Sequence, residues 1–229
     1  MRVIEEWQHW AIDAPPAMSA SLGVSSDGGL PVVKLHGAMA AGWSETAKLL
    51  DEFGADADKE LAELDYLETA RYQARRIGEP PPATHAYSAS EFFDRPLPGR
   101  AIGVLLQQLT EGGGVRELGL MPWGAAYGSV APQATAYPHR QTRFSVEHLA
   151  FTPEPDPAAH QWIRRQWATA HPYGTGGVYA NFQDTEIEDW PTAYYGRNLD
   201  RLRQVKHHYD PDKVFGAIPR ATCRSLAKT

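Results

Sequence analysis

A chain of 229 residues with a hydrophobic share of 42% and a charged share of 22% is long enough to form one large domain or two small ones around a sizeable core. Its formal net charge of -6 argues against a general nucleic-acid binder, which is usually basic. The single cysteine, Cys223, excludes an internal disulfide and a cysteine-based zinc site, and it favours a reducing, cytoplasmic location. Neither a signal peptide nor a membrane span is indicated, because residues 1–13 are amphipathic with acidic side chains and no apolar run is long enough to cross a bilayer.

The first third of the chain predicts helices separated by short extended or irregular segments. Ile4, Trp7 and Ala11 recur at helical spacing, and Pro15-Pro16 ends that pattern. The expected order is a helix over 2–14, a Ser- and Gly-rich loop over 17–30, a strand over 32–36, a turn over 37–43, a helix capped by Ser44, a charged helical segment over 56–76 and a proline-containing loop over 79–83.

The middle of the chain has the most regular apolar patterns, alternating between helical and strand periods. The expected elements, with the residues that share an apolar face, are a helix over 99–110 (Ile102, Leu105, Leu106 and Leu109), a strand over 115–121 (Leu118 and Leu120), a strand over 143–151 (Phe144, Val146, His148 and Ala150) and a helix begun by Asp156-Pro157 (Ala159, Trp162, Ile163 and Trp167).

The end of the chain predicts a strand over 177–184 and a helix from Pro191 to Asp210-Pro211. Tyr179 and Asn181 alternate with apolar neighbours and therefore share one face of this strand. The helix carries an apolar stripe, which we expect to pack inward, made of Leu199, Leu202, Val205 and Tyr209. Strands with a period of two, without strict strand–helix alternation, favour an α+β fold in which helices cover one side of an antiparallel sheet.

Several residues are candidates for a functional site. Glu147 and His148 are neighbours on one predicted strand, so one of them must face the side of the sheet that the helices leave open, and each is a pocket candidate. The alternative for both is a polar group satisfied beneath a helix. The histidines do not have the spacing of a metal site, so we expect no bound metal, and no Ser-His-Asp order indicates a catalytic triad.

Two blocks of sequence resemble the berberine bridge enzyme type of FAD-linked oxidases. The first runs Y-x-N-F-x-D from Tyr179 and continues as Y-Y-G-x-N from Tyr194 to Asn198 and Y-D-P-x-x-x-F from Tyr209 to Phe215. The second is T-A-Y-P-H-R at residues 135–140, and Phe92-Phe93-Asp94 is a weaker match. The order of the blocks is that of the family, and they cover most of the chain. The resemblance implies a substrate domain over 1–176, with a broad antiparallel sheet whose open face turns towards the flavin, and a C-terminal segment over 177–222.

The resemblance also implies residue roles. Tyr179, Asn181 and Phe182 would lie against FAD, Tyr137, Glu147 and His148 would line the substrate pocket, and Glu147 and Tyr179 are the candidates for the catalytic base. Several members of the family have a tyrosine base where Phe182 stands, and phenylalanine has no hydroxyl that can take a proton. The family's Q-S-[IV] after the final phenylalanine is missing as well.

Nothing in the chain resembles the family's FAD-binding domain, because no glycine-rich turn joins a strand to a helix. We therefore expect the C-terminal part of a FAD-dependent oxidoreductase that oxidises an alcohol, a sugar or a natural-product ring with O2, and that is inactive without a FAD domain. Such a chain would be a fragment or one half of a split enzyme, with a FAD-domain chain or a second copy as partner. The alternative is a small-molecule-binding protein or a cofactor-free cyclase that works alone.

Overall fold

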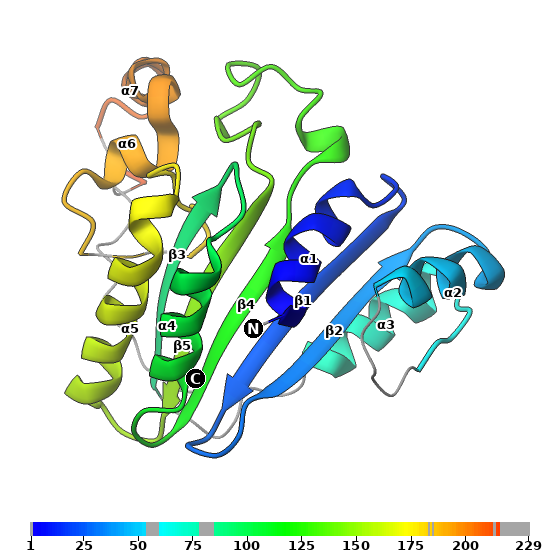
Figure 1. The fold of residues 1–229 in the computed structure, drawn as a ribbon. Helices are drawn as coiled ribbons and strands as arrows, with labels where there is room; N and C mark the ends of the chain where they lie inside the picture. Colours follow the sequence, from blue (N-terminus) through cyan, green and yellow to red (C-terminus); the bar gives the residue numbers. More distant parts are fainter. Residues whose placement is uncertain are drawn as a thin grey trace.

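The structure is a computed structural model that describes residues 2–53, 60–77, 85–182, 184, 186–212, 214 and 215. In that part of the chain one antiparallel sheet is the central feature (Figure 1). Its order is β2-β1-β4-β5-β3, and the strands are β1 (Met18–Ser26), β2 (Val32–Met39), β3 (His85–Phe93), β4 (Val115–Pro122) and β5 (Phe144–Thr152). The predicted α+β fold with an antiparallel sheet is confirmed.

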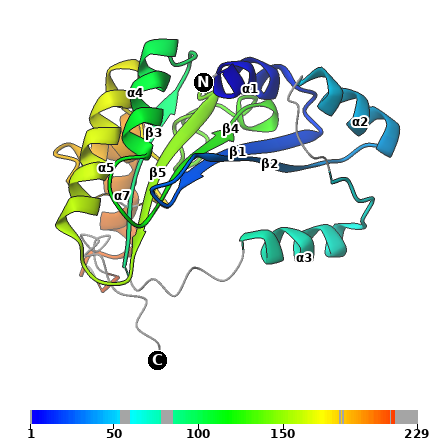
Figure 2. The ribbon, with the colours of Figure 1, turned by 60° about the horizontal axis from the view of Figure 1, so that its bottom comes forward.

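Helices cover one face of this sheet and continue beyond two of its edges. The α-helices are α1 (Arg2–Asp13), α2 (Trp43–Glu52), α3 (Tyr66–Ile77), α4 (Gly99–Leu109), α5 (Pro157–Ala170), α6 (Trp190–Tyr195) and α7 (Leu199–Tyr209). Helices α1, α4 and α5 pack on the same face, α2 lies beyond the β2 edge, and α3 lies below β2 on the side of the sheet away from α1 (Figures 1 and 2). None of the helices in the part of the chain that the structure describes is long and apolar enough to cross a bilayer.

The core lies between this helix layer and the sheet, and the period of two in the strands explains its composition. Leu22, Leu118 and Val146 are neighbours across the sheet on the face that meets the helices. Burial of the aromatic rings adds most to this core, because each ring removes a large apolar area from water. The largest buried side chains of this core are those of Trp7, Trp162, Phe93 and Phe144.

Strand β1 corrects the prediction of a loop over residues 17–30. Ala20, Leu22, Val24 and Ser26 are buried in alternation, while the intervening small residues face the other side of the sheet. The serines and glycines suggested a loop, but here they form the uncovered side of a strand that pairs with β2 and β4. Strand β3 is a further strand that the sequence patterns did not predict.

The predicted strand over residues 177–184 is also wrong. The Phe92 N–H donates to the Gly177 carbonyl over 2.9 Å, so the chain touches β3 there. The Val178 N–H then donates to the Ala193 carbonyl over 3.1 Å, and the Phe182 N–H donates back to the Tyr179 carbonyl over 3.0 Å. These bonds join the segment to α6 and close a turn, which leaves too few partners on β3 for another strand.

The predicted helix after Pro191 is divided into two pieces. Gly196 has a φ of 47°, a left-handed value that glycine adopts readily, and it separates α6 from the short 3-10 helix before α7. The apolar stripe of α7 is not packed inward as expected, because Tyr209 is 79% exposed and Val205 is 38% exposed. Val214 and Phe215, which follow α7, are also exposed.

The remaining boundaries agree with the sequence in the most periodic elements and differ elsewhere. Helices α1, α4 and α5 and strands β4 and β5 lie where they were predicted, and Asp156 caps α5 by accepting from the Ala158 N–H over 2.8 Å. Strand β2 extends to Met39, through half of the expected turn. Ser44 does not cap α2, which begins at Trp43. Residues 54–59 and the proline-containing loop lie outside the described residues.

Phe144 provides a test of this core. Its ring stacks on Phe93 at 5.0 Å between centroids and meets the edge of Trp7 at 6.0 Å. Phe144→Ala should lower the free energy of unfolding by about 3–5 kcal/mol, because it removes the ring and leaves a cavity. Urea unfolding followed by circular dichroism measures this change. Leu30→Ala is the control, since Leu30 is 91% exposed, and equal losses for the two variants would contradict this packing.

Candidate functional site: the open face of the sheet

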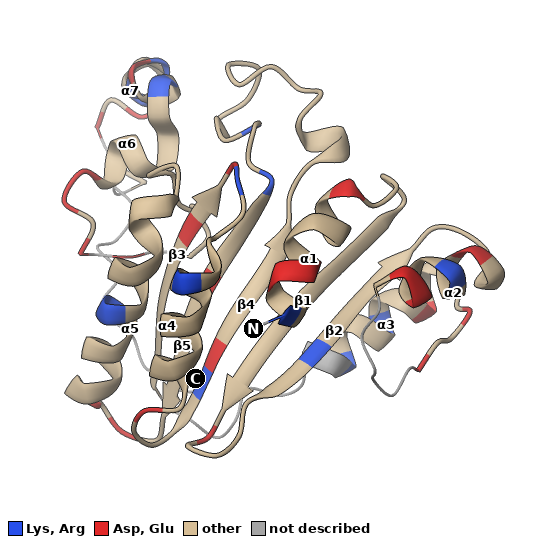
Figure 3. Cartoon of the chain, in the orientation of Figure 1, with Lys and Arg blue, Asp and Glu red and all other residues tan. Residues whose placement is uncertain are grey.

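The sheet face opposite α1, α4 and α5, called the open face below, carries a row of small and polar residues across all the strands. The row consists of Lys34, Gly23, Gly119, Glu147 and Ser90, each directly opposite the next. Its second and third positions are glycines, so no side chain of the row itself rises between Lys34 and Glu147, and the Glu117 Oε1 from the next row lies 3.2 Å from the place where a Cβ on Gly23 would stand. Along the strands most residues are uncharged, with isolated acidic and basic segments (Figure 3). The row therefore forms a shallow floor, with the carboxyls of Glu147 and Glu117 beside it.

Glu147 is the most perturbed carboxyl of this face. Burial raises its pKa to about 8, and the nearby charge of Glu117 raises it further in the same direction. Glu117 lies two residues before Gly119 on β4 and faces the same side. Burial raises the pKa of Glu117 as well, and the charge of Lys34 opposes that shift. A carboxyl that titrates near neutral pH can hold a proton or accept one under physiological conditions.

His148 lies on the other side of β5, in the core. Its side chain is fully buried at 0% exposure, opposite Ala89 on β3 and Leu118 on β4. Burial lowers the pKa of His148 to about 3, so the ring is neutral beneath the helix layer. The structure therefore removes His148 from the candidate pocket residues and leaves Glu147 as the member of this pair that faces outward.

An aromatic hollow of about 420 Å³ lies near the end of β4 and the start of β5. The rings of Trp123 and Tyr137 stack at 5.7 Å with 21° between their planes, and the Trp123 Nε1–H donates to the Ser145 hydroxyl over 2.9 Å. Burial raises the pKa of Tyr137, so its hydroxyl stays protonated. The hollow is lined by Trp123, Tyr127, Ala136, Tyr137, Arg140, Tyr179, Ala180, Asn181, Tyr194 and Tyr195. Such walls suit a flat ligand.

Tyr179 connects this hollow to the open face. Its backbone N–H donates to the Ser90 hydroxyl over 3.3 Å, and Ser90 lies directly opposite Glu147. The Asn181 amide donates to the Tyr179 hydroxyl over 2.7 Å, and the Phe182 ring meets Tyr179 edge-on at 5.0 Å. The structure thus brings Tyr137, Tyr179, Asn181 and Phe182 together at one end of the face that carries Glu147, although the segment is not a strand.

The two sequence blocks of the resemblance contact each other. His139 Nε2 donates to the Tyr194 carbonyl over 3.1 Å as the neutral tautomer, because burial lowers the pKa of this imidazole. Its ring also packs on Phe92 at 5.1 Å. The Asn198 amide donates to the carbonyls of Pro132 and Thr135 over 2.6 and 3.0 Å. These bonds hold the loop that carries Tyr137 against the C-terminal segment.

Sequence reasoning did not single out Trp123, Glu117, Gly23 or Ser90. The predicted strand over 115–121 placed Leu118 and Leu120 inward, so the alternation already contained the outward position of Glu117. The other positions lie on β1, β3 and the loop after β4, and only their pairing brings them beside Glu147.

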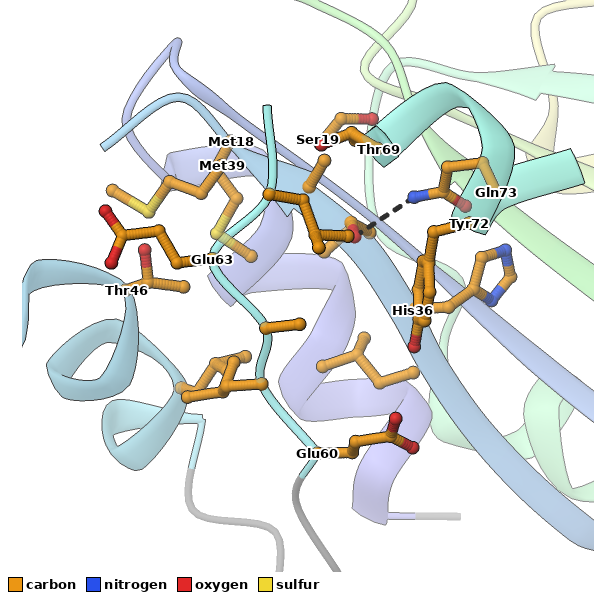
Figure 4. Close-up of a pocket in the computed structure, with 18 of the residues that line it drawn as sticks. Met18, Ser19, His36, Met39, Thr46, Glu60, Glu63, Thr69, Tyr72 and Gln73 are labelled. Atoms are coloured by element: carbon orange, nitrogen blue, oxygen red, sulfur yellow. Dashed lines mark hydrogen bonds between the residues drawn. The ribbon is translucent and has the colours of Figure 1, made fainter. Parts of the chain in front are cut away.

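A second hollow of about 450 Å³ lies at the β2 edge, between β2, α2, α3 and residues 60–64. Figure 4 shows Met18 and Met39 on one side of it and His36 beside Tyr72 on the other. The Gln73 amide donates to the Gly37 carbonyl over 3.1 Å and ties α3 to the edge strand. Strands β1 and β4 separate this edge from β5, so this hollow is distant from Glu147.

Comparisons with known proteins agree with this arrangement. A family model described as berberine and berberine like matches residues 178–218. The FAD-linked oxidoreductase YgaK of Bacillus subtilis (strain 168) is 35% identical over 133 residues, an alignment that covers 56% of this chain and 29% of YgaK. Tetrahydroberberine oxidase of Berberis wilsoniae is 24% identical over 203 residues, which cover 80% of this chain and 36% of that protein.

Solved structures share the fold. Berberine bridge enzyme from Eschscholzia californica superposes with a TM-score of 0.83 and 19% identity, covering 100% of this chain and 53% of that one. A variant of berberine bridge enzyme in complex with (S)-reticuline gives a TM-score of 0.82 with 17% identity, covering 97% of this chain and 52% of that one. The chain thus spans about half of these enzymes. It resembles the berberine bridge enzyme type of FAD-linked oxidoreductases in sequence and in fold, as its motifs predicted.

Gly177 tests the contact between the two sequence blocks. A Cβ at this position would lie 2.5 Å from two atoms of the His139 ring, which Phe92 and the Tyr194 carbonyl hold in place. Gly177→Ala should therefore cost roughly 1–3 kcal/mol in the free energy of unfolding, measured in urea. Gly113→Ala is the matched control, because nothing lies within 4 Å of its added Cβ. A neutral Gly177→Ala would show that the loop and the segment are not locked together.

Glu147 predicts a pH dependence of stability. The folded state raises its pKa from 4.5 to about 8, so between these values the folded chain holds a proton that the unfolded chain releases. The contribution of this group to stability is thus lost as the pH rises through that window. The free energy of unfolding of Glu147→Gln should not show this loss. Between pH 5 and pH 9 the variant should therefore become more stable relative to the unaltered chain by on the order of 2 kcal/mol. Urea unfolding at both pH values measures the difference, with the exposed Glu188→Gln as control.

Proposed function

We propose that this chain forms the substrate-facing sheet of a FAD-dependent oxidoreductase that oxidises an alcohol, a sugar or a natural-product ring, with O2 as the final acceptor. The observation that carries the proposal is the position of Glu147. It is the carboxyl whose pKa lies near neutrality, and it stands on an uncovered sheet face beside a glycine floor. The relatives named above are FAD-linked oxidoreductases of the berberine bridge enzyme type, which favours the same chemistry.

The aromatic hollow fits part of a flavin. Its walls are rings with their faces or edges turned to one space, and the exposed Asn181 amide stands at its border. Tyr179, Asn181 and Phe182 would lie against the flat ring system, while Trp123 and Tyr137 would close the hollow on the sheet side. Bound flavin supplies a hydride acceptor, which no amino-acid side chain provides. A site for the pyrophosphate group is not found among the described residues, so the rest of the cofactor would need another part of the protein or another chain.

This chain's own residues would bind and orient the substrate and move one proton. The ionised Glu147 carboxylate accepts the proton from a substrate hydroxyl or amine that lies over Gly119, while the substrate carbon is oxidised. Gly119 permits close approach of a ring to the backbone. Trp123 and Tyr137 limit the access of water from the end of the sheet. Phe182 contributes shape alone, because its ring has no titratable group.

The surface of α7 and the residues after it supports a covered state. Tyr209, Val214 and Phe215 are 77–79% exposed and follow one another at the end of the described chain. Apolar side chains gathered in this way usually pack against another surface. We propose that a FAD-binding region, on the same polypeptide or on a partner, covers them together with the open face; a second copy of this chain is the other occupant to test.

A second candidate function follows from the hollow itself. A volume of about 420 Å³ lined by aromatic rings is sufficient for a small flat ligand without any flavin. In that case the chain would be a stand-alone binding protein or a cofactor-free cyclase. Flavin dependence distinguishes the two functions.

The test joins this chain to the part of YgaK that lies outside their alignment. The joined protein should bind flavin and oxidise candidate alcohols and sugars, and the chain alone should be colourless. Glu147→Gln should lower turnover by about 10²–10⁴-fold with little change in substrate affinity, because the proton acceptor is lost. Glu188→Gln is the control. Full turnover in Glu147→Gln would show that another residue is the base, with Tyr179 as the next candidate. Stoichiometric flavin bound to the chain alone would contradict the proposal that another region is needed to hold FAD.

A further inference from the structure

Gly119 leaves an open slot in the middle of the open face. Gly23 on β1 and Glu147 on β5 lie directly opposite it, one on each side. Among the described residues, a Cβ built on Gly119 would meet a single atom within 4 Å, the Cβ of Glu147 at 3.8 Å. Its neighbours on the same face along β4 are Glu117 and Met121. The space above Gly119 is therefore free to receive part of a ligand.

A second carboxyl stands on the side of this slot away from Glu147. The Glu117 Oε1 lies 3.2 Å from the place where a Cβ on Gly23 would stand, so this side chain leans from β4 over β1. Glu147 stands on β5, the other neighbour of β4. Adjacent strands are about 4.8 Å apart, which puts β1 and β5 about 10 Å from each other. The slot over Gly119 thus has a carboxyl on each side and room for one ring between them.

Both carboxyls are available to a ligand. In the part of the chain that the structure describes, neither Glu117 nor Glu147 is held by a hydrogen bond or an ion pair. Both residues are nevertheless half-buried. A half-buried acceptor without a partner is costly, and in native proteins such a group usually has a ligand, an ion or water to accept from. Two such acceptors around one empty position indicate a site that binds hydrogen-bond donors.

We propose that Glu117 is a specificity-determining residue, and that the slot takes a ring with hydroxyl groups on two opposite edges. One hydroxyl meets Glu147 and the other donates to Glu117, while the ring lies over Gly119. The use of Glu147 as the base rests on the proposed function, which this inference deepens by naming the class of substrate. The binding of the second hydroxyl by Glu117 does not depend on that use.

Lys34 favours a hydroxyl over an ammonium group as the donor to Glu117. It lies directly opposite Gly23, on the strand next to the one over which Glu117 leans, and its positive charge already acts on this carboxylate. A second cation would be repelled by Lys34, whereas a neutral hydroxyl would not. Ser21 and Ser25 stand on either side of Gly23 on the same face and supply further hydroxyls. A polyhydroxylated ring matches these groups.

The experiment compares three small rings by NMR titration of the ¹⁵N-labelled full chain, without any flavin. The probes are cyclohexanol, trans-1,4-cyclohexanediol and trans-4-aminocyclohexanol, and the amide signals of Gly23 and Gly119 report on the site. The diol should bind about tenfold more tightly than cyclohexanol, because it adds one hydrogen bond to a charged acceptor. The amino alcohol should bind no more tightly than the diol.

Variants of Glu117 and Gly119 test the two parts of the site. Glu117→Leu should abolish the preference for the diol, and Glu117→Gln, which keeps an acceptor oxygen, should retain part of it. Gly119→Ala should fold normally, because its new Cβ makes only ordinary contact with Glu147. Its methyl group fills the slot, so binding of both alcohols should be lost. The exposed Glu188→Gln is the control and should change neither binding nor preference.

Each outcome decides the inference. An unchanged diol preference in Glu117→Leu, or unchanged binding in Gly119→Ala, would overturn it if thermal unfolding is preserved. Tighter binding of the amino alcohol than of the diol would overturn the class of substrate. If Glu117→Leu does not fold, Glu117→Gln and Gly119→Ala still decide. If no ring binds the chain alone, KM values in the joined protein replace the dissociation constants, and equal values for the diol and cyclohexanol would reject the inference.

The joined protein also separates this inference from the proposed function. Full turnover of Glu147→Gln, together with a diol preference that Glu117→Leu abolishes, would reject the proposed function and leave the Glu117 site standing. Loss of turnover in Glu147→Gln, together with an unchanged diol preference in Glu117→Leu, would reject this inference alone.

Discussion

The uncovered face of the five-stranded sheet is the constraint on which the rest of the structure depends. Strand geometry gives every second residue to each face, so one set of residues packs against α1, α4 and α5 while the other set remains outside. The inner set is mostly apolar and closely packed. The outer set mixes serines and glycines with isolated charged residues and with apolar residues such as Leu149 and Phe92. Such a face has no core of its own, so its chemistry comes from a small number of partly buried polar groups.

Partial burial explains why Glu147 differs from the surface carboxyls. The side chain is close enough to the sheet to lose most of its hydration, and among the residues that the structure describes no cation forms an ion pair with it. A carboxyl in this position is costly for stability, and proteins keep such groups mainly where they have a function. The neighbouring Glu117 increases the cost, which makes the pair unusual in a chain with many exposed acidic residues.

The C-terminal segment is fixed to the sheet by buried polar contacts, and these determine the shape of the aromatic hollow. Glu91, at 0% exposure, accepts from the Gly176 N–H over 2.9 Å and contacts His171 Nδ1 at 2.6 Å. Burial raises the pKa of Glu91, and its contact with His171 opposes that effect. Because both partners lie in the turn before Tyr179, Glu91 sets where that ring stands. The shape of the hollow therefore depends on a residue on the core side of β3 as well as on residues of the open face.

The sequence by itself determined the elements in which apolar residues repeat at one period, namely α1, α4, α5, β4 and β5, and it determined the resemblance through its two motif blocks. It also showed that one of the two neighbouring residues Glu147 and His148 must face the open side of the sheet. Only the tertiary structure decided between them, because the choice depends on which face of β5 meets α5. It likewise decided that the Ser- and Gly-rich residues of β1 form a strand. These residues have little strand preference of their own, and pairing with β2 and β4 provides the backbone hydrogen bonds that hold them in a strand. The approach of the Glu117 carboxylate to Gly23 joins two positions that lie far apart in the chain, and no local pattern contains that information.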